Sequence, residues 1–569
     1  MNTHIKQVQI IVSLLKQNDI RYFVISPGTR HVPLVHLVET DNFFTCYSVV
    51  DERSAGYVAL GLAEATNSPV CLTCTSATAT CNYLPAIKEA YERNLQIVAL
   101  TADRARFQRF HGENQCINQV DMYNPYTLCS VDVPNVQNEE EYWYCNRCVN
   151  EALLELDHHG KGPVQINFLE PLSILSLSHF SEGEVPKTRK IDRLNPNSDF
   201  SLVYEKLRNC KRILVISGQY YDKIGALNEA LLHFYKNYES VITYDHFSSV
   251  CGSEFIFSPV VSDVINDNEM RKLAPDLIIT FGTKVFSGLG VKYRNHHIEH
   301  WHITPEGEIY DSLHTLRYVF EMEPETFFRK VSSMSNAKNS KEYRNAWNNR
   351  VQKLQMAVDD FTNRFVVKRV LENLPDNSMV HTSVLNSMRL ANFCHLPHNT
   401  ILHGNICADG IDGALSSFLG QAAASNKLSL LIVGDLSFLY DMNVLLDSVG
   451  QNLRVLLINN YSGAEFHYNI SVNRIDILDR HIAANHRSGF QEIAKICNWE
   501  YLRALNETEL SKQLSVFWGD SDRPIILEVV TDRFVDGKSL RDFYNRNRKT
   551  TLRKRVGDFL RKVHVKKEY

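Results

Sequence analysis

Short apolar runs that alternate with helix-forming segments constrain the fold of this chain more than any other feature. Two examples are Leu428–Val433 and Leu453–Ile458, which have the length and composition of strands buried on both faces. Regular alternation of such strands with helices is typical of parallel α/β sheets. Because the pattern fills three successive blocks, the sequence predicts an α/β protein with three consecutive doubly wound, mainly parallel-sheet domains.

With 569 residues, the chain is too long for a single hydrophobic core. We expect domains over residues 1–185, 186–355 and 356–545. Residues 546–569 differ, because lysine and arginine outnumber the acids there and apolar residues recur at helical spacing. This segment is predicted to form a basic amphipathic helix. Such a helix either lies solvated on its own domain or docks to an anionic membrane surface or an acidic partner.

The composition, with 44% hydrophobic residues, 22% charged residues and a net charge of −4, is typical of a soluble globular protein and gives no sign of nucleic-acid binding. No apolar run approaches the roughly 20 residues that span a bilayer. The N-terminal segment has the pattern of an amphipathic helix rather than of a signal peptide. The thirteen cysteines are therefore expected to be reduced thiols in a cytoplasmic protein.

Polar residues follow the two apolar runs named above. Asp435 comes after Gly434 at the end of the first run, and Asn460 closes the second. If these strands are neighbours, a carboxylate and an amide oxygen face one crevice at the carboxyl edge of the sheet, where ligands of α/β folds bind. Such hard oxygen ligands suit Mg²⁺ bridged to a phosphate group. The alternative is that both residues are ordinary helix N-caps.

The first block carries a second group of strand-end segments. Small, hydroxyl and arginine residues gather at Ser26–Arg30, Thr75–Ala79, Thr101–Arg104 and Gly112–Gln115. An acidic pair, Asp51 and Glu52, stands directly before an apolar helix, where capping alone would explain it. Several such segments at one sheet edge nevertheless predict a binding rim.

Eight motifs follow one another along the chain: SPGTR, DERSAGYVALGLA, TSATAT, LTADR, GENQ, GIDGALS, GDLSFLYDMN and NNYSG. In this order they resemble the thiamine-diphosphate (ThDP) enzymes, and among them the menaquinone-pathway 2-succinyl-5-enolpyruvyl-6-hydroxy-3-cyclohexene-1-carboxylate (SEPHCHC) synthase family. The resemblance implies ThDP and Mg²⁺ (or Mn²⁺) as cofactors. It implies a carboligase, a transketolase-type transferase that decarboxylates a 2-oxo acid donor and passes the acyl carbanion to an acceptor. It also implies a homodimer or homotetramer with active sites at the subunit interface.

The resemblance assigns roles to individual positions. The Asp435 carboxylate, the Asn460 side chain and the Ser462 carbonyl are expected to hold the metal ion. Glu52 is expected to be the catalytic residue that bonds the aminopyrimidine ring of ThDP, which calls for a buried carboxyl with a raised pKa. The other expected cofactor-binding residues are Ser76, Gly434, Leu436, Ser437 and Gly463. The expected substrate-binding residues are Arg30, Arg104, Asn114 and Gln115.

Three positions depart from the family pattern. One family arginine is replaced by Ile406, a second aligns with Ala423, and a family lysine aligns with Gly288. Because a hydrogen bond to a charged group contributes about 1.5–3 kcal/mol, the lost arginines predict a different, smaller 2-oxo acid donor. The alternatives are a true SEPHCHC synthase acting on 2-oxoglutarate and isochorismate, a simple 2-oxo-acid decarboxylase, and a non-catalytic cofactor-binding protein.

Overall fold

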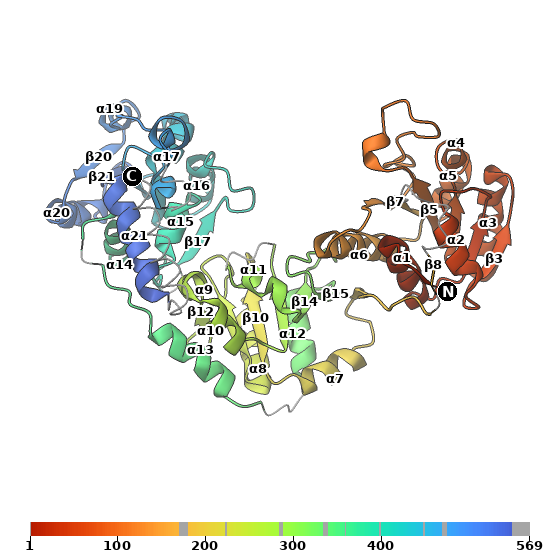
Figure 1. Cartoon of the computed structure of the whole chain (residues 1–569). Coiled ribbons are helices and arrows are strands. Elements are labelled where there is room, and N and C mark those ends of the chain that lie inside the picture. Colours follow the sequence, from red (N-terminus) through yellow and green to blue (C-terminus); the bar gives the residue numbers. More distant parts are fainter. Residues whose placement is uncertain are drawn as a thin grey trace, which may run out of the picture. The chain divides into compact units, whose positions relative to one another are not determined.

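The computed structural model describes residues 2–169, 180–181, 183–221, 225–283, 288–333, 339–358, 360–397, 400–447, 450–468 and 475–548. The chain divides into two compact units, Met1–Asn197 with Glu306–Glu321, and Ser198–Pro305 with Met322–Tyr569. Each unit contains parallel strands alternating with helices (Figure 1). The predicted fold class, α/β with mainly parallel sheets, is confirmed.

Six parallel strands form the sheet of the first unit, in the order β3-β2-β4-β5-β7-β6. Their bounds are β2 (Tyr22–Ile25), β3 (Thr45–Ser48), β4 (Val70–Cys74), β5 (Ile97–Asp103), β6 (Cys129–Val133) and β7 (Val164–Leu169). The helices of this unit are α1 (Lys6–Gln17), α2 (Val32–Glu39), α3 (Glu52–Thr66), α4 (Thr78–Cys81), α5 (Leu84–Glu92) and α6 (Glu139–Leu154). Both faces of the sheet are covered, because Cys71 of β4 packs in the cluster of α1 and α6 while Val70 and Leu72 pack in that of α3 and α5.

The chain reverses its direction of travel across this sheet between β2 and β4, which are direct neighbours. The loops after these two strands contain the SPGTR and TSATAT motifs. They pack so closely that a Cβ added to Gly28 would lie 2.4 Å from Thr75 Cβ. Helices α3 and α5 cross with similar closeness, since a Cβ on Gly56 would lie 2.5 Å from Ala86 Cβ. Ligands of α/β sheets bind at such a reversal point.

Two short strand pairs complete the first unit. Strand β1 (Asn2–Thr3) pairs with β8 (Phe180–Ser181) in antiparallel fashion. Strand β9 (Asp192–Leu194) pairs in parallel with β15 (Leu316–Phe320). In the sequence, β15 comes after residues 198–305, which belong to the second unit.

The second unit begins with a run of parallel strands in the order β12-β11-β10-β13-β14. Their bounds are β10 (Ile213–Ser217), β11 (Val241–Tyr244), β12 (Ile256–Phe257), β13 (Leu277–Phe281) and β14 (Glu299–Ile303). The accompanying helices are α7 (Ser201–Asn209), α8 (Leu227–Tyr238), α9 (Pro259–Val264), α10 (Asp267–Lys272), α11 (Leu289–Tyr293), α12 (Pro324–Ser332) and α13 (Glu342–Gln352).

The other sheet of the second unit has the order β17-β16-β18-β19-β21-β20 and is parallel throughout. Its strands are β16 (Met379–Thr382), β17 (Ile401–Gly404), β18 (Ser429–Gly434), β19 (Leu453–Asn459), β20 (Glu500–Ala504) and β21 (Ile525–Val530). The helices are α14 (Asn363–Glu372), α15 (Asn386–Ala391), α16 (Ala414–Ala423), α17 (Asp435–Asp441), α18 (Ala464–Tyr468), α19 (Gln491–Ile496), α20 (Glu507–Phe517) and α21 (Arg533–Asn547). Strands β18 and β19, the two runs singled out in the sequence, lie side by side with Gly434 opposite Ile458.

All thirteen cysteines lie among the described residues, and none of them forms a disulfide there. In the same part of the chain, no helix has the length and apolar character needed to cross a membrane. Of the basic segment 546–569, Arg546–Arg548 continue from α21, and residues 549–569 lie outside the described residues. The domain bounds given above stay predictions.

Candidate active site

Asp435 is the first residue of α17 and lies at the carboxyl edge of the sheet that contains β18 and β19. Its Oδ1 accepts a hydrogen bond from Leu436 N at 2.7 Å, and its Oδ2 accepts from Asn460 N at 3.1 Å and Ser462 N at 3.2 Å. The side chain is buried. The N-cap alternative does not hold for this residue, because Gly434 is the N-cap of α17 and no side chain caps the helix. Through its hydrogen bonds to Asn460 N and Ser462 N, Asp435 instead links the loop after β19 to the end of β18.

The two asparagines at the end of β19, Asn459 and Asn460, have different roles. The Asn459 amide is occupied, since its Nδ2 donates to Glu528 Oε1 at 2.6 Å and to Ser488 O. In the Asn460 amide only the nitrogen has a hydrogen-bond partner, since Nδ2 lies 3.5 Å from Asp536 Oδ2. The amide oxygen, Oδ1, is buried and has no hydrogen-bond partner. A buried carbonyl oxygen without a partner costs about 1–3 kcal/mol. Because the Asn460 backbone N–H is bonded to Asp435, this oxygen fits a ligand of a metal ion near that carboxylate.

Asp536 orients Asn460 and was not identified from the sequence. Its carboxylate accepts from Thr531 Oγ1 at 2.7 Å and from Asn363 N at 2.8 Å. Burial raises the pKa of Asp536 to about 6. Because it comes from the first turn of α21, some 75 residues after Asn460, no local motif connects the two residues.

The remaining residues predicted to bind the cofactor in this unit have hydrogen bonds of their own. Ser462 Oγ donates to Ala483 O at 3.1 Å, and the Ser462 carbonyl accepts from Ala464 N at 2.9 Å. Gly463 N donates to Ala483 O at 2.6 Å, and Ser437 Oγ donates to Ile411 O. A carbonyl oxygen has two lone pairs, so the Ser462 carbonyl retains the capacity to bind a metal ion.

His486, a second residue that was not identified from the sequence, lies next to the Asp435 carboxylate. His486 Nε2 is 3.2 Å from Asp435 Oδ2, and His486 Nδ1 accepts from Ser488 N at 3.1 Å. Because Nδ1 accepts, a neutral imidazole carries its proton on Nε2, facing Asp435. His486 also lines a pocket of about 520 Å³ together with Tyr461, Asn485, Arg487 and Arg533. Two guanidinium groups in this pocket favour an anionic ligand.

In the first unit, Glu52 begins α3 and is half-buried. The preceding residue, Asp51, caps the helix, because its Oδ1 accepts from Ser54 N at 2.7 Å, and this hydrogen bond lowers the pKa of Asp51. The buried environment expected for Glu52 is not present within the single chain. Its neighbours Val50 and Tyr57 are 78% and 49% exposed. Exposed apolar side chains therefore lie close in sequence to this carboxylate, at the start of α3.

The structure brings together two residues predicted from separate motifs. Ser76 Oγ donates to Gln115 O at 2.9 Å, which joins the loop after β4 to the GENQ segment. The next residue, Ala77, has a φ of 68°. An L-residue is strained in this region. A hydrogen bond of 2.8 Å from Ala77 N to Gln119 Oε1 holds the strained residue in place.

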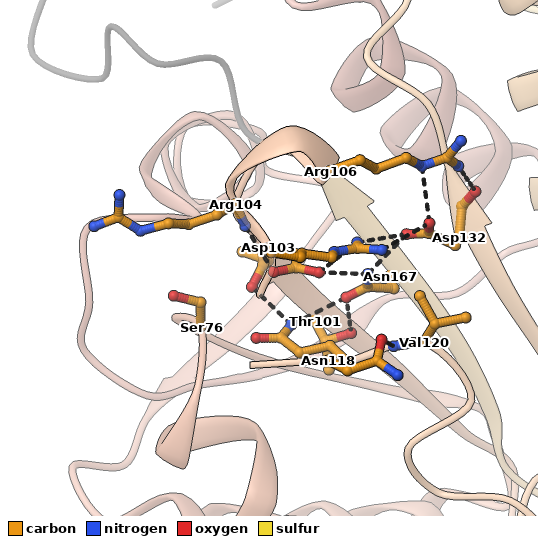
Figure 2. Close-up of polar contacts among 12 residues, drawn as sticks. Ser76, Thr101, Asp103, Arg104, Arg106, Asn118, Val120, Asp132 and Asn167 are labelled. Carbon is orange, nitrogen blue, oxygen red and sulfur yellow. Dashed lines mark hydrogen bonds and ion pairs between the residues drawn. The ribbon is translucent and has the colours of Figure 1, made fainter. Parts of the chain in front are cut away.

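Gln119 belongs to a buried polar network between β5, β6 and β7. Gln119 Nε2 donates to Asn167 Oδ1 at 3.0 Å, and Asn167 Nδ2 donates to Asp103 Oδ2 at 3.0 Å and to Asp132 Oδ1 at 2.8 Å. Arg109 completes the network through ion pairs with the two aspartates, at 2.6 and 3.2 Å (Figure 2). Burial opposes the charge of Arg109, but its hydrogen bonds and the nearby carboxylates raise its pKa overall. The network rigidly supports the strand ends beneath the rim.

The predicted substrate residues lie on the same rim. Arg104 follows β5, and Figure 2 shows its guanidinium directed away from the aspartates while its backbone N donates to Asp103 Oδ1 at 2.7 Å. Its side chain lies 3.7 Å from Glu113. Arg30 is partly buried in the SPGTR loop, and Asn114 is exposed. His31, another residue that sequence reasoning missed, is buried against Thr73, and burial lowers its pKa to about 4, so the ring is neutral near pH 7.

Comparison with known proteins shows which family the chain belongs to. Residues 5–122 match the family model described as "Thiamine pyrophosphate enzyme, N-terminal TPP binding domain". SEPHCHC synthases from Bacteroides thetaiotaomicron and Bacteroides fragilis are 33% identical to this chain, over 95% of this chain and 98% of each relative. The chain belongs to the SEPHCHC synthase family. The enzyme of the same name from Flavobacterium johnsoniae is 28% identical, over 94% of this chain and 98% of that protein.

Membership of the SEPHCHC synthase family identifies the chain as a ThDP enzyme that acts on small molecules and forms carbon–carbon bonds with decarboxylation. The positions that depart from the family pattern can now be placed. Ile406 follows β17 at the carboxyl edge of its sheet and is 1% exposed, within the hydrophobic core. Gly288 precedes α11 as its N-cap.

The inference drawn from Ala423 is wrong. Ala423 is the last residue of α16, a few residues before β18 begins. In a strand–helix–strand crossover, the end of the helix lies at the amino edge of the sheet, opposite the carboxyl edge where ligands bind. An arginine aligned with Ala423 would therefore not reach the crevice of Asp435. Of the two arginine positions, only Ile406 lies at the carboxyl edge of the sheet.

Proposed function

We propose that this chain binds ThDP and a divalent metal ion, Mg²⁺ or Mn²⁺, and uses them to decarboxylate a 2-oxo acid and transfer the acyl group to an acceptor. The buried, unpartnered Asn460 Oδ1 beside the anionic Asp435 is the observation that carries this proposal. When bound, ThDP supplies the nucleophilic and electron-accepting chemistry for cleavage of the bond next to the 2-oxo group.

Asp435, Asn460 and the Ser462 carbonyl would hold the metal ion. Oxygen donors of this kind match the preference of Mg²⁺, which retains positions for phosphate oxygens. Asp536 accepts from Asn460 Nδ2 at 3.5 Å, which leaves the amide oxygen for the metal ion. Arg487 and Arg533, in the adjoining pocket, would add positive charge for the diphosphate.

Glu52 would exchange a proton with the aminopyrimidine ring. A carboxyl performs this task best when it is removed from water, because desolvation raises its pKa towards neutrality. We therefore infer that a second subunit covers Glu52 and the exposed side chains of Val50, Tyr57 and Val58. This assigns the protein a homodimer or homotetramer with active sites at the subunit interface. Thirteen free thiols suit a reducing compartment, and we propose the cytoplasm.

We propose that the donor is a smaller 2-oxo acid than 2-oxoglutarate. A buried isoleucine at position 406 cannot pair with a distal carboxylate, whereas the arginine of the family can. Since one charged hydrogen bond contributes about 1.5–3 kcal/mol, its loss corresponds to roughly a 10- to 100-fold loss of affinity.

A panel of donors tests the proposal. The purified chain, with Mg²⁺ and ThDP, is incubated with 2-oxo acids of increasing length, with and without isochorismate or aldehyde acceptors. Release of CO₂ is measured, and products are identified by mass spectrometry. We expect kcat/KM to be highest for a short monocarboxylic donor. A rate with 2-oxoglutarate equal to that of a SEPHCHC synthase would overturn the altered donor, and no CO₂ release from any donor would overturn the function.

The second candidate is SEPHCHC synthase activity itself. It is favoured by the retention of Arg30 and Arg104 at the rim and by similarity over nearly the whole length of the synthases. In the same experiment it predicts CO₂ release from 2-oxoglutarate and formation of an isochorismate adduct. A simple decarboxylase would release an aldehyde whether or not an acceptor is present.

A further inference from the structure

Two histidines and a glutamate of the first unit converge away from the active-site rim. His158 and His159 lie in the loop that follows α6, and Glu321 directly follows β15. One ligand atom from each of the three lies within 4.8 Å of those of the other two. These segments are more than 150 residues apart in sequence, so the pairing is made by the fold.

The distances between these atoms are close to those of a metal site. His159 Nε2 is 2.7 Å from Glu321 Oε1, and His158 Nε2 is 3.6 Å from the same oxygen. Two ligands bound about 2.0–2.1 Å from a tetrahedral Zn²⁺ ion lie about 3.4 Å apart. Small side-chain rotations would therefore place all three ligands around one ion. Because His159 is 68% exposed, such rotations are open to it.

His158 is oriented in the way that metal-binding histidines usually are. Its Nδ1 lies 2.9 Å from Glu155 Oε2, and Glu155 is in turn held by Arg193 at 2.6 Å. A carboxylate on Nδ1 fixes the proton there and leaves the Nε2 lone pair available for a metal. The side chain is 9% exposed, and Nε2 is buried without a hydrogen-bond partner.

The space in front of His158 is kept open by a glycine. Gly307 has a φ of 71°, and a Cβ at this position would lie 3.0 Å from His158 Nε2 and 3.1 Å from Glu321 Cδ. The cluster also lines a pocket of about 460 Å³ that gives access to solvent. An ion held by three protein ligands would have room there for a bound water.

We propose that His158, His159 and Glu321 form a binding site for a divalent transition-metal ion of the Zn²⁺ class. Imidazole nitrogens with one carboxylate oxygen favour Zn²⁺ over Mg²⁺, which takes oxygen ligands. The ion would join the loop after α6 to the end of β15 and so cross-link two distant segments of the first unit. Glu155 acts as a positioning residue for His158. The site is independent of the cofactor site proposed above.

Zn²⁺ binding is measured on the full chain after treatment with chelator and saturation with Mg²⁺ and ThDP, which occupies the Asp435 site. Competition with a chromophoric chelator gives the affinity, and Co²⁺ absorption spectra report the ligands. We expect one tight equivalent per chain, with affinity at least about 100-fold weaker in H158A and E321Q. The loss should be about 10- to 100-fold in E155Q, since outer partners of metal ligands have effects of this size.

H233A is the matched control, because His233 is a single exposed histidine on α8 and should not change the affinity. H159Q guards against a folding defect, since this side chain is largely exposed; it should weaken Zn²⁺ binding while the melting temperature of the metal-free chain stays constant. Equal Zn²⁺ affinity in the wild type, H158A and H159Q would overturn the site. A Co²⁺ spectrum dominated by thiolate charge transfer would assign the ion to cysteines and would also overturn it.

Discussion

Asp435 combines a structural and a proposed chemical role in one side chain. Its two oxygens accept hydrogen bonds from three backbone N–H groups, which fix the direction of the carboxylate. We predict that D435N retains the fold but loses metal-dependent activity by at least about 100-fold, because an amide cannot offer the negative charge. Activity is measured as CO₂ release over a Mg²⁺ titration.

Asp441, at the far end of the same helix, provides the control for Asp435. It is also buried, and it accepts from Ser416 N and Ser416 Oγ, both at 2.7 Å. D441N should reduce stability by about 1 kcal/mol and leave the Mg²⁺ dependence unchanged. If D441N and D435N had the same Mg²⁺ dependence, the assignment of Asp435 would be wrong.

Glu52 and Asp51 are adjacent acids with separate tasks. Asp51 caps α3, whereas the Glu52 side chain is assigned to the cofactor. We predict that E52Q lowers kcat by about 10²- to 10⁴-fold, the usual range for loss of a proton-transfer group. D51N should have nearly wild-type activity and stability, because asparagine is an equally good N-cap. Comparison of kcat for the two variants checks the assignment, which an active E52Q would contradict.

Asp245, which follows β11, gives the stability of the protein a pH dependence. The side chain is buried and accepts from Phe247 N at 2.9 Å, and burial raises its pKa to about 7. In the unfolded chain this carboxyl has the ordinary aspartate pKa of about 3.8. Between these two pKa values the folded state binds more protons than the unfolded state. The contribution of Asp245 to the free energy of unfolding is therefore greatest below about pH 4 and is lost as the pH rises to 7.

We predict that D245N removes this part of the pH dependence and is more stable than the wild type above pH 7, by up to about 4 kcal/mol. Urea unfolding of both proteins at pH 5 and pH 7.5 measures the difference. D522N is the control, since the Asp522 side chain is 92% exposed. A D245N variant with the same slope as the wild type would show that Asp245 does not titrate in this range.

Among the elements, the loop between β4 and α4 depends on a distant glutamine. Gln119 is fully buried; it accepts from the strained Ala77 N and donates to Ala102 O and Asn167 Oδ1. We predict that Q119L destabilises the protein by about 2–3 kcal/mol, since it leaves buried polar groups unpaired. Thermal and urea unfolding measure the loss. Q96L, which removes one hydrogen bond of 3.3 Å to Leu156 O, should cost less than half as much.

The elements also show where sequence reasoning succeeds. Apolar strand runs such as Leu453–Asn459 are visible in the sequence because both faces of a parallel strand are buried. Asp435 and Asn460 stand directly after two such runs, so their proximity at the carboxyl edge of the sheet could be predicted. Asp536, His486 and Gln119 could not, because each reaches its partner across the tertiary fold. Ala423 shows where sequence reasoning fails. Its alignment with a family arginine suggested a residue of the substrate pocket, whereas the topology places it at the amino edge of the sheet, opposite the edge where ligands bind.

For the whole molecule, the proposed active site depends on association of two chains. The side chains of Val50, Tyr57 and Val58, close to Glu52 in sequence, are exposed, and burying them is the driving force expected for an interface. We predict that V50D dissociates the oligomer and abolishes activity while the secondary structure is preserved. Light scattering coupled to size-exclusion chromatography, together with circular dichroism, makes the measurement.

L202D is the matched control, because Leu202 is a 65% exposed residue on α7. It should leave the molar mass and the activity unchanged. A monomeric wild type with full activity would refute the shared site. An oligomeric V50D would show that the interface lies elsewhere.

The close contacts of Gly28 with Thr75 and of Gly56 with Ala86 define which positions an engineer can vary. No side chain larger than hydrogen fits at either glycine without moving a neighbouring backbone segment. A combinatorial library aimed at new donors should therefore keep these four residues fixed, since their failures would be misfolded proteins rather than altered catalysts. Sequence diversity is better placed at the SPGTR arginine and around Ile406, the positions that we propose to determine the choice of donor.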